Sequence, residues 1–153
     1  MKQLDQLFEG AVVAQLDLPE PITVSAGSKL SDAVKAMRES KRGAVVVVGD
    51  GIAGIFTEVD YVKKVLGAGV SAEAKVDDFM TKDPKTVAPD TKLSAAFELM
   101  SRGDFRHLPV ANGKACSGLL QVRHLNQYLA ERFPQDVLAL PPDVHQVLAV
   151  DGG

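Results

Sequence analysis

This chain of 153 residues has little cysteine and few aromatic side chains: one cysteine, no tryptophan, and an aromatic content of 5%. The single Cys116 excludes an intrachain disulfide and any zinc site built from several cysteines. We therefore expect packing alone to hold the fold. With 46% hydrophobic and 24% charged residues, the length and composition are typical of one globular domain or of two small fused halves.

The chain also has no excess of positive charge and no long apolar run. Its formal net charge is -3 and its pI is near 5.6, whereas nucleic-acid binding depends on clustered Lys and Arg that neutralise phosphates. No apolar run approaches the roughly 20 residues that a membrane span needs. The first residues, MKQLDQLFEGAVV, lack the charged-then-apolar order of a signal peptide. We expect a cytoplasmic protein that binds neither nucleic acid nor a membrane.

Motifs for catalysis and for metal binding are missing as well. The stretch GDGIAG at 49–54 matches G-x-G-x-x-G, but these glycines lie between two predicted strands rather than between a strand and a helix. His107, His124 and His145 are far apart and lack HExxH spacing, and no Gly-x-Ser-x-Gly elbow occurs. We predict no catalytic residues and no metal site, although an enzyme assembled between subunits or a metal binder stays open as a third possibility.

What the sequence does contain is an internal repeat. The segment PITVSAGSKLSDAVKAM at 21–37 aligns with PKTVAPDTKLSAAFELM at 84–100, 63 residues later. Eight residues are identical at this offset: Pro21, Thr23, Val24, Lys29, Leu30, Ser31, Ala33 and Met37 recur as Pro84, Thr86, Val87, Lys92, Leu93, Ser94, Ala96 and Met100. Farther on, Gly54 aligns with Gly118, so one residue has been inserted in the intervening turn, where insertions are tolerated.

Each copy predicts the order β-α-β-β-α, and thus a mixed α/β fold. A short extended piece, at 22–24 and at 86–88, leads to a helix with apolar residues at i, i+3, i+4 and i+7, which begins at Leu30 in the first copy and at Leu93 in the second. In the first copy a buried strand from Ala44 to Val48, a tight turn and a returning strand follow. A second helix is expected to start near Thr57 and to run to about Leu66. Two such copies, each with one uncovered apolar face, are expected to pack face to face as a pseudo-twofold pair. The predicted boundaries are an N-terminal packing arm at 1–20, repeat 1 at 21–70, a linker with a short helix at 71–83, repeat 2 at 84–132 and an extended tail at 133–153.

The two copies differ at the start of the second helix. Repeat 1 has Thr57 and Asp60 there, and repeat 2 has Gln121 and His124. Thr followed by an acid three residues later is close to a helix capping box, which is the structural alternative. Because repeat 2 lacks this cap chemistry, we infer that the fold does not require the pair, and that the Asp60 carboxylate is suited to accept two hydrogen bonds from a ribose diol.

Repeat 2 offers further polar candidates in the stretch DFRHLPV at 104–110. Arg106 is a cation suited to phosphate, and His107 could stack on a ligand or hydrogen-bond to it. Pro109 has no amide hydrogen, which suits an edge position. Each of these residues, taken alone, is typical of an ordinary surface side chain. Their occurrence together in one short segment strengthens the prediction of a ligand site.

These features resemble a tandem pair of CBS domains, also called a Bateman module. The resemblance rests on Pro-x-x-Val at both strand starts, apolar helices that end in Met37 and Met100, RHLPV at 106–110, and Gly-apolar-apolar-Thr-x-x-Asp at 54–60. It covers nearly the whole chain, and the tail FPQDVLALPP is similar to that of small free-standing bacterial members.

The resemblance implies a regulatory, non-catalytic module that binds an adenine nucleotide or S-adenosylmethionine between the repeats and often forms a homodimer. It implies that Asp60 holds the ribose hydroxyls and that Thr57 bonds the ribose or the α-phosphate. The remaining residues of this site would be Thr86, Val87 and Ala88 around the base, and Arg106, His107, Leu108 and Pro109 toward the phosphates and the cleft wall. The mirror site would comprise Thr23, Val24, Gly43, Ala44, Gln121 and His124.

The mirror site departs from the family pattern, because a neutral His accepts at most one good hydrogen bond from a diol. We therefore predict one competent ligand site per chain and no required cofactor. Because we expect no effector domain fused to the pair, the regulated partner would be a separate, unidentified protein or the same chain in an oligomer. The alternative is a ligand-free dimerisation or protein-interaction module in which Thr57 and Asp60 only cap a helix.

Overall fold

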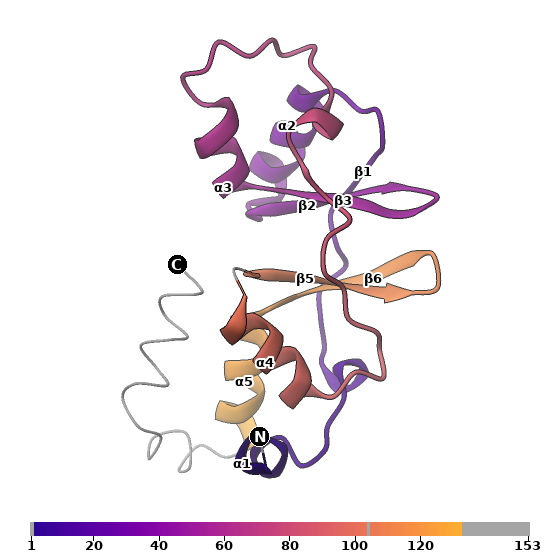
Figure 1. The fold of residues 1–153 in the computed structure, drawn as a ribbon, viewed down its shortest axis with the longest axis vertical. Helices are drawn as coiled ribbons and strands as arrows, with labels where there is room; N and C mark the ends of the chain where they lie inside the picture. Colours follow the sequence, from indigo (N-terminus) through magenta and orange to yellow (C-terminus); the bar gives the residue numbers. More distant parts are fainter. Residues whose placement is uncertain (1, 104, 133–153) are drawn as a thin grey trace. The chain divides into compact units, whose positions relative to one another are not determined.

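The computed structural model describes residues 2–103 and 105–132 (Figure 1). Strands and helices alternate along the chain, and the described part divides into two compact units, so the predicted mixed α/β fold with two repeats is confirmed. Each unit has its own apolar core. The extended tail predicted at 133–153 lies outside the described residues.

Unit 2 comprises Glu20–Lys85 and Ala111–Gly118 and is built around a four-stranded sheet of order β1-β2-β3-β4. Strand β1 pairs with β2 in parallel, whereas the β2–β3 and β3–β4 pairs are antiparallel. The core of unit 2 contains the fully buried side chains of Val45, Val47, Phe56 and Val76. Its elements are β1 (Thr23–Ser25), α2 (Leu30–Ser40), β2 (Ala44–Gly49), β3 (Gly51–Thr57), α3 (Glu58–Asp60), the π-helix η2 (Tyr61–Val65), the 3-10 helix η3 (Val76–Asp78) and β4 (Thr81–Lys82).

Unit 1 comprises Met1–Pro19, Thr86–Val110 and the chain from Leu119 onward. Its core contains the fully buried side chains of Phe8, Leu108, Leu120 and Leu125. Strands β5 and β6 form a two-stranded sheet, and the turn between them is grouped with unit 2, where Lys114 Nζ lies 2.7 Å from Asp50 Oδ1. The remaining elements are α1 (Lys2–Leu7), the 3-10 helix η1 (Val13–Gln15), α4 (Leu93–Arg102), β5 (His107–Asn112), β6 (Ala115–Gln121) and α5 (Val122–Arg132).

The boundaries of the compact units differ from those of the two sequence repeats. The segment that precedes repeat 1 packs with repeat 2 in unit 1, and the segment that precedes repeat 2 packs with repeat 1 in unit 2. In unit 1, the amide of Val13 donates to Thr91 O at 2.9 Å and the amide of Leu93 donates to Ala11 O at 2.9 Å. In unit 2, the corresponding bonds run from Val76 N to Ser28 O (2.9 Å) and from Leu30 N to Ala74 O (2.6 Å). The four residues of one set lie 63 positions from those of the other, so the exchange is reciprocal.

Two elements differ from the sequence prediction. The second helix of repeat 1, expected to run to about residue 66, is a short α3 followed by the π-helix η2. Residues 86–88, expected to form a strand, are joined to β5 only by a single parallel bridge between Val87 and Val110. This bridge corresponds to the Val24–Val47 pair of β1 and β2, so the pairing direction is kept although the ladder is shorter.

Candidate functional site

The start of α3 in unit 2 is closed by a reciprocal cap between Thr57 and Asp60. The amide of Asp60 donates to Thr57 Oγ1 at 3.2 Å, and the amide of Thr57 donates to Asp60 Oδ2 at 3.0 Å. The Thr57 hydroxyl also donates to Asp60 Oδ2, at 3.1 Å. These are the bonds of a capping box, which satisfies two amides that the helix leaves without intrahelical partners.

The Asp60 carboxylate is buried and has a cation beside it. Asp60 is 8% exposed, and its second oxygen, Oδ1, lies 3.2 Å from Lys64 Nζ one helical turn later. The same ammonium donates to the backbone carbonyl of Phe79 at 3.0 Å. A buried carboxylate needs such compensation, since an unpaired charge away from water is costly.

The other unit 2 residues that were predicted for the mirror site lie on neighbouring strands. Thr23 and Val24 belong to β1 and pair with β2, and Ala44 stands opposite Thr57 in the β2–β3 ladder. The carbonyl of Gly43 accepts from the Glu58 amide at 3.0 Å. A Cβ on Gly43 would lie 3.3 Å from the Glu58 carboxyl carbon, so a larger residue there would crowd that side chain.

In unit 1, the structure brings the predicted base-pocket segment against the RHLPV segment. The amide of Val87 donates to Pro109 O at 3.0 Å, and the amide of Ala88 donates to Thr91 Oγ1 at 2.9 Å. The Leu108 and Pro109 side chains are buried, whereas Thr86 and Arg106 are exposed and His107 is half-buried. The predicted residues of this unit are therefore neighbours, and the exposed members Thr86 and Arg106 are available to solvent.

At the start of α5, His124 takes the structural position of the acid. The amide of Gln121 donates to His124 Nδ1 at 2.9 Å, which is the counterpart of the bond from Thr57 to Asp60 Oδ2. The inference that repeat 2 begins this helix without such a cap is therefore wrong. Sequence reasoning missed it because imidazole is not a common capping group, although a neutral His has one acceptor nitrogen.

His124 is held neutral by its surroundings. The side chain is 7% exposed, and burial, together with the charges of Arg123 and His107, lowers its pKa from 6.5 to about 4. Because Nδ1 accepts a hydrogen bond, the hydrogen of the neutral ring must be on Nε2. Nε2 is buried without a hydrogen-bond partner. His124 also lines a cavity of about 250 Å³ formed by residues 15–18 and the α5 side chains Gln127, Tyr128 and Glu131.

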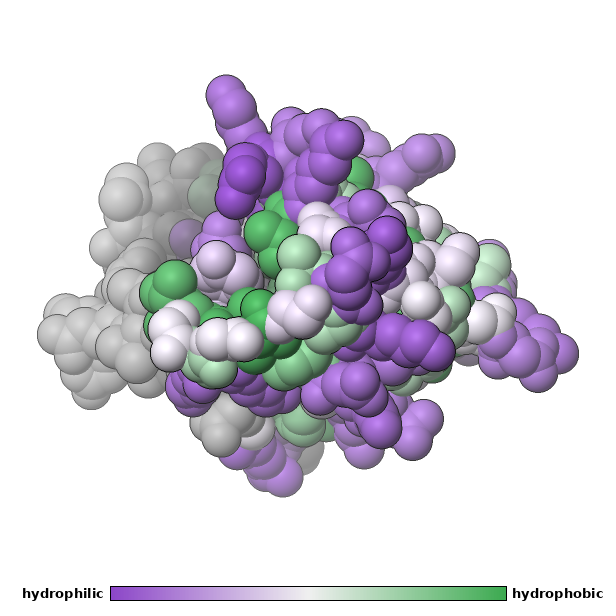
Figure 2. All heavy atoms as spheres, turned by 90° about the horizontal axis from the view of Figure 1, so that it is seen from above, coloured by the Kyte–Doolittle hydropathy of each residue, from purple (hydrophilic) through white to green (hydrophobic). Residues whose placement is uncertain are grey.

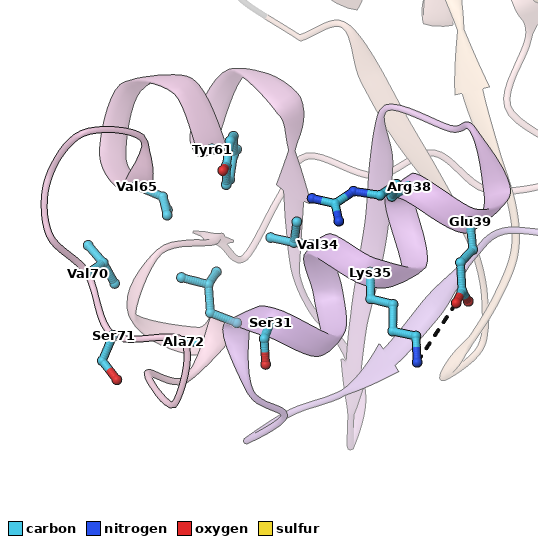
Figure 3. A pocket seen from close by; sticks show the side chains of 11 residues that line it. Ser31, Val34, Lys35, Arg38, Glu39, Tyr61, Val65, Val70, Ser71 and Ala72 are labelled. Carbon is cyan, nitrogen blue, oxygen red and sulfur yellow. Dashed lines mark ion pairs between the residues drawn. The ribbon is translucent and has the colours of Figure 1, made fainter.

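A larger open groove, of about 530 Å³, lies on the helical side of unit 2 (Figure 3). Side chains from α2, from η2 and from the segment 70–72 converge on it, with Val34, Tyr61 and Val65 forming apolar walls. Apolar side chains gather in the middle of this face among hydrophilic ones (Figure 2), and Val62 and Leu66 nearby in sequence are each 60% exposed. Sequence reasoning did not identify this groove, because its two walls are not adjacent in the chain.

Two further features of the described chain bear on function. Within residues 2–103 and 105–132, no three His, Cys, Asp or Glu side chains are close enough together to hold a metal ion. No helix in the same ranges is both long enough and apolar enough to cross a membrane.

Comparison with known proteins gives matches over most of the chain. The family model described as "CBS domain" matches residues 13–67 and 76–131. The CBS domain-containing protein CBSX3, mitochondrial, of Arabidopsis thaliana is 42% identical over 98 residues, which are 60% of this chain and 48% of that protein. The aligned part therefore spans about half the length of this curated relative.

Among solved structures, CBSX2 in complex with AMP has a TM-score of 0.67 at 22% identity and covers 80% of this chain and 98% of its own. The CBS domain pair of MJ0100, in complex with 5'-methylthioadenosine and S-adenosyl-L-methionine, has a TM-score of 0.69 at 17% identity, with coverage of 80% and 98%. At these identities the likeness concerns the fold. The two matches of the family model cover more than half of the chain, and the chain therefore belongs to the CBS domain family, with two copies in tandem.

Proposed function

We propose that this chain is a non-catalytic sensor module that binds an adenine nucleotide or an adenosyl compound, with the ribose held by Asp60. CBS-pair proteins are in general regulatory, and the solved relatives CBSX2 and MJ0100 hold AMP, 5'-methylthioadenosine or S-adenosylmethionine. The observation in this chain that carries the proposal is a buried carboxylate, Asp60, fixed in orientation by two bonds from Thr57.

The chemistry of Asp60 suits a vicinal diol. An ionised carboxylate has two acceptor oxygens with about four lone-pair positions, and hydrogen bonds to a charged acceptor contribute roughly 1.5 to 3 kcal/mol. Thr57 fixes the carboxylate through Oδ2, so reorienting the side chain adds little to the cost of binding. Thr57 in this proposal positions Asp60 and can also contact the ribose or an α-phosphate.

The predicted partners in repeat 2 complete the proposed site. Backbone groups of Thr86, Val87 and Ala88 would line the base, and Arg106 and His107 would lie toward the phosphates beside the wall formed by Leu108 and Pro109. The adjacency of these two segments within unit 1, through the bond from Val87 N to Pro109 O, supports treating them as one surface.

The mirror site with Thr23, Val24, Gly43, Ala44, Gln121 and His124 is proposed to bind weakly or not at all. His124 Nδ1 is already occupied by the Gln121 amide, and its neutral ring leaves only a donor at Nε2. A diol thus finds no free acceptor on this side chain, whereas Asp60 Oδ1 keeps acceptor capacity beside Lys64. One competent site per chain follows.

Binding would act by shifting the geometry of the pair, or of a homodimer, toward the state that holds the ligand better. A ligand that binds two states equally shifts nothing, so the effector must sense a state that the nucleotide favours. We propose a cytoplasmic homodimer that acts on a separate protein, and no required cofactor.

The alternative function is a ligand-free interaction module in which Thr57 and Asp60 only cap α3. Two observations favour it: both second helices begin with the same kind of cap, and the open groove between α2 and η2 gives unit 2 an apolar surface. In that case Asp60 contributes to stability alone.

A calorimetric titration of nucleotide-stripped protein with AMP, ATP and S-adenosylmethionine tests these alternatives. The proposal expects saturable binding near one equivalent per chain and a loss of affinity of about 10- to 100-fold in Asp60→Asn, which keeps a capping oxygen but removes the charge. Asp32→Asn, on the exposed side of α2, is the matched control and should bind as the wild type does. Absence of heat with all three ligands, together with an unchanged Tm, would favour the interaction module.

A further inference from the structure

The acceptor oxygens of Asp60 are nearly all in use before any ligand arrives. Oδ2 accepts two bonds from Thr57, at 3.0 and 3.1 Å, and Oδ1 faces the Lys64 ammonium at 3.2 Å. A carboxylate has about four acceptor positions, so about one is free. A vicinal diol needs two acceptors, and one of the present donors must therefore yield.

Lys64 is the donor that can yield. Releasing Thr57 from Oδ2 would leave a backbone amide at the start of α3 unsatisfied, because that amide bonds to Asp60. The Lys64 side chain is 43% exposed, compared with 11% for that of Asp60, so its ammonium can move into water at low cost. Its other partner is the carbonyl of Phe79 at 3.0 Å, in the segment that leads into repeat 2.

The repeat offers an internal contrast at this position. The residue of α5 that corresponds to Lys64 is Tyr128, which is buried and stacks under Arg132, whose Cζ is 5.1 Å from the ring centroid. Repeat 2 thus has an uncharged tyrosine at the position of Lys64, and a histidine in place of a carboxylate at the position of Asp60. The cation and the acid occur together in one repeat and are both missing from the other.

We propose that Lys64 is a specificity-determining residue of the Asp60 site that makes the site select for phosphate on the adenosyl ligand. This inference rests on the proposed function and deepens it. When a ribose diol takes Oδ1, Lys64 loses its carboxylate partner. A ligand with a 5'-phosphate supplies a new anion for the released ammonium, whose flexible four-carbon stem allows it to follow.

Ligands without a phosphate bind less favourably, because they displace Lys64 from Asp60 without offering its ammonium a phosphate in return. Neutral adenosine displaces Lys64 and returns nothing to it. S-adenosylmethionine brings a sulfonium cation next to a displaced ammonium, and like charges in proximity are unfavourable. Its carboxylate is separated from the ribose by the methionine chain and so lies farther from the released ammonium than a 5'-phosphate does. The site therefore ranks AMP above adenosine and above S-adenosylmethionine, and the margin depends on Lys64.

The test is a comparison of ligand ratios in Lys64→Met, which keeps the length of the apolar stem and removes the charge. Calorimetric titrations with AMP, adenosine and S-adenosylmethionine are made on the full chain. We expect AMP to bind about 3- to 10-fold more weakly and adenosine about 3-fold more tightly than in the wild type, because one charge-assisted contact is lost and one competitor is removed. Lys64→Arg should retain most of the AMP preference, since it keeps the cation.

The matched control is Lys63→Met, at an exposed lysine one residue earlier. It changes the net charge by the same amount, so it should leave the AMP-to-adenosine ratio within about twofold of the wild type, because an exposed charge at a distance is largely screened. The preference of the wild type for AMP should also decrease as salt is raised, and that of Lys64→Met should decrease less, because only Arg106 of the proposed site then remains as a cation for the phosphate.

The outcomes separate this inference from the proposed function. If the wild type binds at least one of these ligands and Lys64→Met changes the affinities for AMP and adenosine by the same factor, or not at all, the role of Lys64 is wrong while the site stands. If neither the wild type nor Lys64→Met binds any of them, the proposed function is itself overturned, and this inference with it.

Discussion

The two second helices of this chain start in the same way and with different chemistry. In both, a side chain three residues after the strand end accepts the backbone amide at that strand end, at 3.0 Å for Asp60 and 2.9 Å for His124. The fold therefore requires an acceptor at this position and does not require a charge. The difference between the two residues is informative because it separates what folding demands from what a ligand would use.

A second contrast concerns the surface groove beside each pair of helices. In unit 1, Phe8 lies between α4 and α5, with ring centroids 6.3 Å from Phe97 and 6.1 Å from Tyr128. In unit 2, the residue 63 positions later is Ser71, and it lines the open groove between α2 and η2. One aromatic side chain thus marks the difference between a filled groove and an open one.

The largest expected effect tests this groove contrast. Phe8 is fully buried, and Phe8→Ala should lower the free energy of unfolding by about 3 to 5 kcal/mol, because it removes the aromatic side chain and leaves a cavity. Ser71→Ala at the equivalent position should change it by less than about 0.5 kcal/mol. Urea denaturation at neutral pH measures both. Similar losses in the two variants would mean that the grooves are equivalent.

A smaller effect is expected from acidification, and it sharpens the cap contrast. The pKa of His124 is lowered to about 4 in the fold and should return to about 6.5 on unfolding, so the unfolded chain binds more protons between these values. His124 thus contributes stability that is complete above about pH 6.5 and is lost as the pH falls toward 4.

The measurement is Tm as a function of pH from 4 to 7 for the wild type and for His124→Asn, which keeps an oxygen for the Gln121 amide. After allowance for partial solvent access to the ring, the free energy of unfolding of the variant, obtained from these thermal transitions, should fall by about 1 to 2 kcal/mol less than that of the wild type over this pH range. Parallel curves would show that His124 does not titrate with a lowered pKa in the folded protein.

The smallest effect compares the residues at the two strand ends. Thr57→Ala should cost about 1 kcal/mol, because the hydroxyl accepts the Asp60 amide and donates to the Asp60 carboxylate. Gln121→Ala should cost less than about 0.5 kcal/mol, since the contact of its side chain, at 3.3 Å, is with exposed Arg123. Urea denaturation measures both losses of stability. If Thr57→Ala and Gln121→Ala lowered the free energy of unfolding equally, the conclusion that only the Thr57 side chain takes part in a helix cap would be wrong.

Much of the fold follows from local pattern. The apolar periodicity that begins at Leu30 and Leu93 predicted α2 and α4, and the run from Ala44 to Val48 predicted a buried strand that the structure contains as β2. These predictions succeed because burial on one helix face or within a sheet imposes a period that the residues display directly.

The main feature that the sequence prediction missed has a non-local cause. The packing of each leading segment with the other repeat depends on hydrogen bonds between residues 44 to 82 positions apart, and no local pattern encodes such contacts. A signal was present, because Ala11 and Val13 recur as Ala74 and Val76, so the repeat begins earlier than residue 21. The π-helical turn after Asp60 was also missed, since helix periodicity over so few residues does not distinguish the two helix types.

Part of the proposed site could also be predicted from the sequence, and part could not. Thr57 and Asp60 stood out because the repeat supplied its own comparison, and the structure shows them bonded to each other. Lys64 did not stand out, since a lysine in a helix is usually a solvated side chain. Its significance comes from distances to Asp60 and Phe79, and these exist only in the folded chain.

The sequence by itself determined the mixed α/β class, the tandem repeat and the family, because repeated apolar spacing and a retained polar motif are written along the chain. Only the tertiary structure decided that the segment preceding each repeat packs with the other repeat, that His124 replaces the acid as a cap, and that Lys64 pairs with the second oxygen of Asp60. The physical reason is that hydrogen bonds and ion pairs depend on distances of about 3 Å between atoms, and the order of residues does not specify those distances until the apolar cores have brought the segments together.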